Sequence, residues 1–283
     1  MRKILCLACS ILVAGCSALD SPKMEDNGPA KVYATVDNPD KDAGTRINLG
    51  DDLRLYWNAD DRISYFDKEI FNYHYRFDGA SGDRSGTFSK VKSVFHSSVE
   101  ISHVYGVYPY DERNAVDEDD ETLTVWFPSV QAYAEGSIGQ GANVMAAVSE
   151  DNNLKFKNLG GYLCIKLYGG DVSVKSVSIT GNSGEQLSGE ANVKMEIGGI
   201  PQTSIVSSGT GKAVKVECSS PVAIGKSPDD YTSFWFVIPP VSFSNGFTMN
   251  VEKNDGGTFE KSTAKSLTIK RNVITSMTPV KVD

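Results

Sequence analysis

Histidine and cysteine are scarce in this chain of 283 residues, and acidic residues outnumber basic ones. It has three His and five Cys, and 36 Asp and Glu stand against 28 Lys and Arg, for a net charge of −8. This balance argues against nucleic acid and anionic membrane surfaces as partners. His74, His96 and His103 lack a second ligand at metal-like spacing, and no GxSxG, HExxH or P-loop sequence occurs. We therefore expect no metal, no cofactor and no enzyme activity.

Carboxylates are the remaining candidates for a chemical site. The run from Asp117 to Glu121 (DEDDE) has the charge to attract Ca²⁺, but it lacks the Gly turn and the alternating ligand spacing of an EF-hand loop. A solvated loop tip is therefore the favoured interpretation. Asp60 and Asp61, which follow Trp57, are adjacent in the chain, and adjacent strand residues point to opposite faces instead of pairing.

Long apolar runs are missing after the first residues of the chain. Arg2 and Lys3 precede the apolar stretch Ile4 to Val13, which is shorter than the ~20 residues of a transmembrane helix and indicates an export signal. The sequence VAGC then matches a bacterial lipobox, which predicts a signal peptide over residues 1–15 and acylation of Cys16. The alternative is an ordinary secretory signal that happens to contain Cys.

Lipid anchoring sets the expected location of the protein. Several acyl chains on one Cys, at ~0.8 kcal/mol per buried CH₂, hold a protein durably on a membrane. Ser17, in place of Asp, follows the acylated Cys16, which favours the outer membrane and hence the cell surface. Residues 16–30 are polar and contain Pro and Gly, so they are expected to form a lipidated tether with nothing to bury.

Only two cysteines remain for the mature protein, since two leave with the signal and a third is the acylation site. Cys164 falls on the Lys166 side of its expected strand, whereas Cys218 shares the phase of Val214 and Val216. Because side chains alternate along a strand, the two thiols are expected on different faces. We therefore predict two free thiols and no disulfide, despite the oxidising compartment.

Sustained helical periodicity is also missing, and GQGANVMAAVSE offers one or two helical turns at most. Short runs rich in Val, Ile, Tyr, Phe and Thr recur instead, among them VYATV, LRLYW and FWFVIPP, with turn signals such as DGASGD and NDGG between them. This pattern predicts β-sandwiches, not an α/β enzyme. Trp57, Trp126 and Trp235 lie in apolar runs and are expected in the core. A boundary near LKFKNLGG gives an N-terminal domain over 31–153 and a C-terminal domain over 154–283.

Taken in order, the segments WNADDRISYF, VYGVYPYDE, LTVWFPSVQAY, FKNLGGYLCIKLYG and FWFVIPPVSFSNGFTMNV resemble the fimbrillin-like (Mfa-like, type V pilin) lipoproteins of anaerobic gut and oral bacteria. The resemblance runs from about Arg46 to Val282, and the serial order of the segments carries it, since no single motif is diagnostic. It implies an all-β fold of two tandem transthyretin-like β-sandwich domains, and a fimbrial subunit that serves cell adhesion.

The resemblance also implies a mode of assembly. In such pilins an N-terminal strand completes the first sandwich, a surface protease of Arg specificity cuts the loop after it, and a strand of the neighbouring subunit fills the vacated groove. Here the removed strand would be VYATVD, with Val32, Ala34 and Val36 in phase. The cut would separate Arg46 from Ile47 in the open loop NPDKDAGTRINLGDD. A loop Arg that is never cut is the alternative.

The C-terminal segment SLTIKRNVITSMTPVKVD is the candidate donor strand, because Leu267, Ile269, Val273 and Met277 give it an apolar rhythm. The alternative, given equal weight, is that this segment is the last strand of the second domain. An anchor or tip subunit would keep the segment paired within its own fold. The implied partners are other fimbrial subunits, the Arg-specific protease and the outer membrane through the lipid. The competing function is a surface glycan-binding lipoprotein, which exposed Trp or Tyr platforms would favour.

The lipobox generates a direct test of acylation. Metabolic labelling with a fatty-acid probe should mark the wild-type precursor and miss the Cys16→Ala variant, because the thiol of Cys16 is the acyl acceptor. A Cys9→Ala variant, which changes a cysteine inside the signal, should be labelled like the wild type. Equal labelling of the Cys16→Ala variant would contradict the lipoprotein assignment.

Overall fold

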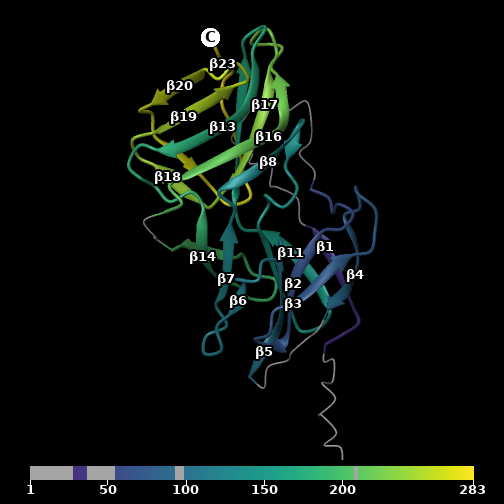
Figure 1. Ribbon diagram of the computed structural model, residues 1–283. Helices are drawn as coiled ribbons and strands as arrows, with labels where there is room; N and C mark the ends of the chain where they lie inside the picture. The colour runs from purple at the N-terminus through teal and green to yellow at the C-terminus, as the bar shows by residue number, and fades with distance from the viewer. Residues whose placement is uncertain (1–27, 37–54, 93–98, 207–209) are drawn as a thin grey trace, which may run out of the picture.

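The computed structural model describes residues 28–36, 55–92, 99–206 and 210–283, and every regular element in these ranges is a β-strand (Figure 1). The expectation of an all-β fold is therefore confirmed. The stretch GQGANVMAAVSE requires a correction, because it forms a turn followed by strand β10 (Met145–Ser149) in place of helical turns. No helix long and apolar enough to cross a membrane occurs among the described residues.

Seven strands close into a barrel, in the order β1-β11-β10-β5-β2-β3-β4. Strand β1, purple in Figure 1, completes the barrel by pairing antiparallel with β4 on one side and parallel with β11 on the other. The barrel strands are β1 (Lys31–Val36), β2 (Arg62–Glu69), β3 (Tyr73–Phe77), β4 (Ser85–Lys92), β5 (Glu100–Tyr108), β10 (Met145–Ser149) and β11 (Asn153–Asn158).

The other described strands form four further sheets, in the orders β20-β19-β13-β16-β8-β9, β17-β12-β22 with β23 also on β12, β15-β14-β7-β6, and β18-β21. These strands are β6 (Ala115–Val116), β7 (Leu123–Phe127), β8 (Val130–Ala134), β9 (Ser137–Ile138), β12 (Gly161–Tyr168), β13 (Ser173–Gly181), β14 (Gly189–Lys194), β15 (Gln202–Ile205), β16 (Ala213–Ala223), β17 (Thr232–Ile238), β18 (Val241–Phe243), β19 (Phe247–Lys253), β20 (Thr258–Thr263), β21 (Leu267–Ile269), β22 (Ile274–Ser276) and β23 (Val280–Lys281).

The expected boundary between residues 153 and 154 falls inside β11, which is a barrel strand. In addition, β7 pairs with β14 and β8 pairs with β16, although β7 and β8 precede that boundary. The chain leaves the barrel after β5 and returns to it at β10. The ranges 31–153 and 154–283 therefore do not separate the sheets of this structure.

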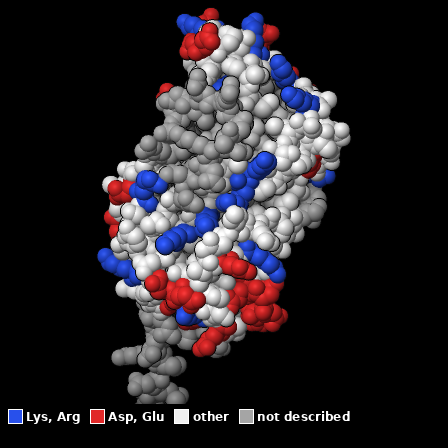
Figure 2. Space-filling view, turned by 180° about the vertical axis from the view of Figure 1, so that it is seen from behind, with Lys and Arg blue, Asp and Glu red and all other residues white. Residues whose placement is uncertain are grey.

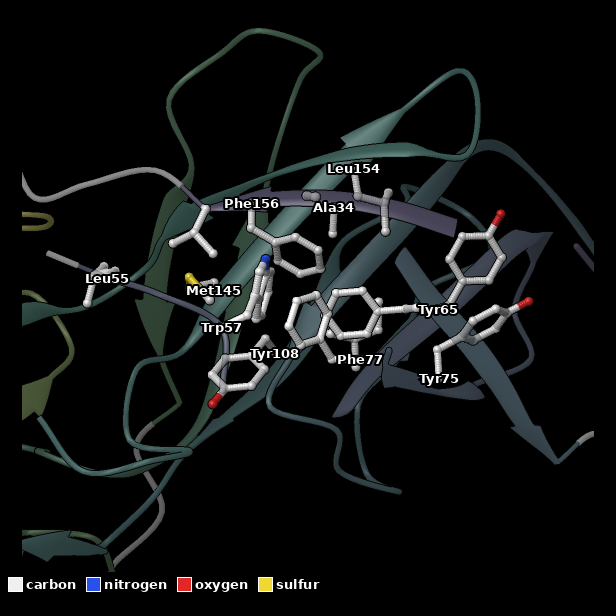
Figure 3. Close-up of a cluster of buried hydrophobic side chains, with 14 of the residues drawn as sticks. Ala34, Leu55, Trp57, Tyr65, Tyr75, Phe77, Tyr108, Met145, Leu154 and Phe156 are labelled. Atoms are coloured by element: carbon white, nitrogen blue, oxygen red, sulfur yellow. The ribbon is translucent and has the colours of Figure 1, made fainter. Parts of the chain in front are cut away.

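Aromatic rings fill the barrel around Trp57, which is fully buried. Its ring centroid lies 4.9 Å from that of Phe88 and 5.4 Å from those of Tyr108 and Phe156, in edge-to-face geometry (Figure 3). The sequence LRLYW is expected to be a strand, but its described part makes only an isolated bridge, between Trp57 and Asp83. Ring packing, more than a strand ladder, therefore holds Trp57 in place.

Strand β12 is buried on both faces, which explains its nearly continuous apolar sequence GYLCIKLY. Tyr162 and Cys164 pack in the barrel cluster around Trp57. The alternate residues pack in a second cluster with β13, β16, β17 and β19, and these are Leu163, Ile165 and Leu167. One strand therefore joins the two hydrophobic cores.

The two described cysteines are free thiols in different clusters, as the alternation of their strands predicts. Cys164 is fully buried beside the barrel core, and Cys218 packs half-buried against the second cluster. Burial raises the pKa of both thiols, and with the added charge of Glu217 the pKa of Cys218 reaches about 11. Both thiols are therefore protonated and unreactive at neutral pH.

The three tryptophans do not share the core position expected of them. Trp57 and Trp235 are 0% and 7% exposed, but Trp126 lies half-buried on the outer face of β7. The Arg113 guanidinium covers its ring at 4.0 Å from the centroid. The core prediction was wrong for Trp126 because the inward phase of β7 belongs to Leu123, Val125 and Phe127.

Candidate functional site

Strand β1 carries three inward side chains on which the closed barrel depends. Val32, Ala34 and Val36 are 1%, 0% and 6% exposed, whereas Tyr33, in the opposite phase, is 43% exposed. The three inward residues belong to the cluster of rings around Trp57 (Figure 3). The phase of this strand is thus the one that the alternation in VYATVD indicates.

Main-chain hydrogen bonds hold β1 at both edges. The Tyr33 N–H donates to the Asn152 carbonyl at 2.9 Å on the β11 side, and the Val36 N–H donates to the Arg84 carbonyl at 3.0 Å on the β4 side. The register pairs Ala34 with Leu154 of β11 and with Gly86 of β4. Loss of β1 would therefore leave two strands with unpaired N–H and C=O groups beside an apolar slot.

Side chains of the barrel also hold the residues that lead into β1. The Lys90 ammonium donates to the Gly28 carbonyl at 3.1 Å, and the Tyr75 hydroxyl donates to the Pro29 carbonyl. The Lys90 N–H donates to the Ala30 carbonyl at 3.1 Å. Residues 28–36 therefore lie on the barrel as one bound segment.

A cavity of about 320 Å³ opens at the far end of β1. Val36 forms part of its wall, together with the apolar side chains of Leu55 and Met145 and the half-exposed ring of Tyr56. The apolar slot beneath β1 thus continues into open space at the Val36 end.

A buried carboxylate fixes the wall of this cavity. Asp61 is 4% exposed and accepts hydrogen bonds from the Asn58 N–H at 2.7 Å and from the Tyr108 hydroxyl and Gln140 Nε2, each at 2.9 Å. Burial raises the pKa of Asp61, and these hydrogen bonds oppose the rise. Asp60 instead lies 3.7 Å from the Arg76 guanidinium, so the two adjacent carboxylates do not face one another.

The C-terminal segment is packed within the chain's own fold. β21 pairs with β18, and β22 and β23 pair parallel with β12. Ile269 is 1% exposed, and Leu267 and Met277 pack against the second cluster. The Val273 carbonyl accepts a hydrogen bond from the Tyr162 N–H at 3.0 Å. In this structure the four candidate donor residues therefore belong to the last strands and turns of the chain.

Several residues singled out in the sequence lie outside the described residues. They are the acylation residue Cys16, the cleavage pair Arg46 and Ile47, and His96. The described histidines have structural neighbours, since the His74 ring stacks on Tyr110 with centroids 4.0 Å apart. Burial and then the Arg62 charge lower the pKa of His74.

The acidic run forms a hydrogen-bonded turn between β6 and β7, toward the end of the molecule where Figure 2 shows Asp and Glu gathered. One Asp117 carboxylate oxygen accepts from the N–H groups of Asp119 and Asp120. The Asp120 carboxylate binds the Lys194 ammonium at 2.7 Å. Within the described ranges, no group of three or more His, Cys, Asp and Glu side chains is arranged to hold a metal ion.

Glu121 ties this turn to the barrel. Its backbone is left-handed (φ 53°), and its carboxylate accepts from the Ser102 N–H at 2.6 Å and the Tyr105 hydroxyl at 2.7 Å, and contacts His103 Nδ1 at 2.8 Å. Burial raises the pKa of Glu121, but the hydrogen bonds from His103, Ser102 and Tyr105 outweigh it and hold the pKa at about 2. Glu121, the last residue of the acidic run, is therefore a structural connection to β5.

Comparison with known proteins gives similarities in structure alone. No family profile matches the chain, and no curated protein matches it. A candidate cell adhesion protein from Bacteroides ovatus is 14% identical, with a TM-score of 0.46 over 85% of this chain and 88% of the other. A candidate cell adhesion protein from Bacteroides uniformis is 17% identical, with a TM-score of 0.45 over 89% and 92%.

A fimbrial protein is also among the similar structures. The tip fimbrial protein Mfa3 from Porphyromonas gingivalis, with a C-terminal truncation, is 10% identical, with a TM-score of 0.32 over 87% of this chain and 94% of the other. These three proteins are described as adhesion or fimbrial proteins, none of them as an enzyme.

The Glu121 contacts generate a prediction for pH dependence. Because the pKa of Glu121 is lower in the folded protein than the ~4.3 of an unfolded Glu, its stabilisation is present above that value and is lost as pH falls toward about 2. Glu121→Gln should lower the free energy of unfolding by roughly 1–2 kcal/mol at pH 7 and by about half as much at pH 3, in urea titrations.

The matched control is Glu118→Gln, which removes one charge from an exposed residue of the same turn. It should leave the urea midpoint unchanged at both pH values. A Glu121→Gln variant as stable as the wild type at pH 7, or equally weakened at both pH values, would contradict the assigned role.

Proposed function

We propose that this protein is a fimbrial subunit that serves cell adhesion, exported as a lipoprotein acylated at Cys16 and held on the outer membrane. It assembles by strand exchange in the groove that β1 fills. The barrel is the first of two tandem transthyretin-like β-sandwich units. The observation that carries the proposal is that one short strand closes the barrel, with only Val32, Ala34 and Val36 reaching the core.

The energetics favour replacement of this strand over an empty groove. Each buried Val side chain is worth roughly 1.5–3 kcal/mol, and the unpaired edges of β4 and β11 add the cost of unmade hydrogen bonds. A strand that aligns with both edges restores the ladder, and its alternate side chains refill the slot. An incoming strand therefore restores the apolar burial and the main-chain hydrogen bonds that are lost when β1 leaves.

Proteolysis in the loop after β1 would release the strand. The proposed cut lies between Arg46 and Ile47, in a segment whose Asp, Gly and Pro residues suit an open loop. The proposed partners are an Arg-specific surface protease, other fimbrial subunits that supply the replacement strand, and the outer membrane through the lipid. Uncut, the chain fills its own groove and stays monomeric.

Limited digestion tests the processing step. An Arg-specific protease should cut first after Arg46, and the large product should begin at Ile47 by N-terminal sequencing. Arg46→Ala should block this cut, whereas the control Arg54→Ala should be cut like the wild type. The cut protein should associate or accept an added strand peptide in size-exclusion chromatography. A first cut elsewhere, or a cut protein that stays monomeric and accepts no strand, would contradict the proposal.

Surface glycan binding is the second candidate function, and a cleft of about 500 Å³ favours it. Tyr133 from β8, and Tyr231 and Trp235 from the β17 region, line this cleft together with Glu135 and Lys166. Tyr231 is 39% exposed, and the Lys166 ammonium lies 4.7 Å from its ring centroid. Aromatic faces beside polar groups are the surroundings in which sugar rings bind.

A glycan array screened with the intact protein separates this candidate from the first. If the cleft binds sugar, Tyr231→Ala should abolish the signal, because the exposed ring is lost. Tyr33→Ala, which removes an equally exposed ring from β1, should keep it. An array without any bound glycan would exclude the candidate.

A further inference from the structure

The three inward positions of β1 differ in the room around them. The central one, Ala34, is fully buried and lies in register between Gly86 of β4 and Leu154 of β11. The outer ones, Val32 and Val36, lie opposite the aromatic residues Phe88 and Phe156. The size of the side chain that fits at each position therefore depends on the free space between the neighbouring side chains.

The Phe77 ring occupies the space beside Ala34 on the β4 side. A Cβ atom placed on Gly86 would lie 2.7 Å from Phe77 Cε2, so the ring rests directly on the glycine. Such a contact is closer than any side chain tolerates, and Gly86 is the residue paired with Ala34. On the β4 side, the Phe77 ring therefore fills the space next to the residue paired with Ala34.

Leu154 and Phe156 occupy the space on the β11 side. A Cβ atom placed on Gly106 of β5 would lie 2.8 Å from Leu154 Cδ1 and 2.8 Å from Phe156 Cζ. These two side chains thus reach across the barrel interior to the backbone of β5, and Leu154 is the β11 residue paired with Ala34. Ala34 is fully buried in the same cluster as these side chains and Phe77 (Figure 3), and we infer that a larger side chain at this position meets them.

The Val36 position is different, because Val36 lines the cavity of about 320 Å³ at the barrel end. A side chain with one more methylene at this position can extend into that space, beside Leu55 and Met145. The groove is thus narrow at its centre and open at one end.

The C-terminal segment of this chain does not match such a groove. In the phase of Leu267 and Met277, every residue that could take the central position has a side chain larger than that of Ala. These residues are Ile269, Arg271, Val273, Thr275, Met277, Pro279 and Lys281. The other phase offers Ser276, whose hydroxyl would go unpaired into an apolar interior. Ile269 and Val282 are also 1% exposed in the second core.

We propose that the groove selects its occupant by size at the Ala34 position, an inference that rests on the strand exchange proposed above. The replacing strand carries Gly or Ala at its centre, an apolar β-branched residue at the Val32 position and a Val or larger apolar residue at the Val36 position. The C-terminal strand of a second copy is excluded. The replacing strand is therefore not the C-terminal segment of another copy, and this chain accepts a strand without supplying its own C-terminal one.

Substitutions in the intact chain test the size filter without strand exchange. Ala34→Val should lower the Tm by several degrees or prevent folding, because the enlarged side chain meets Phe77 and Leu154. The matched control Val36→Ile adds a methyl group at the cavity end and should leave the Tm unchanged. An Ala34→Val protein as stable as the wild type would overturn the filter.

Labelled peptides test the choice of occupant on the full chain nicked after Arg46, with its N-terminal piece still present. Fluorescence anisotropy should show exchange by a peptide of residues 31–36 and by the same peptide with Val36→Ile. The peptide with Ala34→Val should bind about tenfold more weakly or worse, and a peptide of residues 266–282 should not bind.

The outcomes separate the two proposals. Equal binding by the Ala34→Val peptide, or binding by the C-terminal peptide, would overturn the selection while leaving strand exchange in place. If even the peptide of residues 31–36 fails to exchange, strand exchange itself fails, and the Tm of the two intact variants still decides whether the central position is restricted.

Discussion

Hydrogen bonding at two edges by one strand is the constraint on which the barrel depends. β4 and β11 are far apart in sequence, and in the described structure β1 is what joins them. With β1 in place the barrel has no free edge, and the rings around Trp57 are sealed from water. β1 contributes only three inward side chains, all apolar. Its position in the barrel is therefore set by backbone hydrogen bonds and by the size of these side chains, more than by any specific side-chain chemistry.

Local alternation is what made much of the fold readable in the sequence. The phase of VYATVD and the opposite faces of Cys164 and Cys218 follow from a period of two, which any paired strand must obey. The all-β architecture follows from short β-branched and aromatic runs between turn residues. The candidate groove is visible in the sequence for the same reason, because the three inward residues alternate with outward ones along one strand.

Pairing between segments that are distant in the sequence could not be predicted from local alternation. Trp126 looked like a core residue because it is apolar and lies in the run TLTVWF, although its own phase also holds Thr122 and Thr124. The pairing of β7 with β14 and the cover of Arg113 show that this face is outside. The sequence GQGANVMAAVSE is compatible with a helix until β5 and β11 pair with it. The role of Glu121 depends on residues of another strand. The narrow centre of the groove depends on Phe77 and Leu154, which belong to different strands and meet only in the closed barrel.

The parallel pairing of β1 with β11 has a mechanical consequence. β11 continues almost directly into β12, which β22 and β23 also pair in parallel. A pulling force applied along a strand in the β1 position is directed across its hydrogen bonds to both neighbours. These bonds are then loaded together in shear and break together, whereas a strand peeled from one end loses them singly. A load on this strand is therefore passed along β11 into β12, whose two faces pack in the two hydrophobic cores.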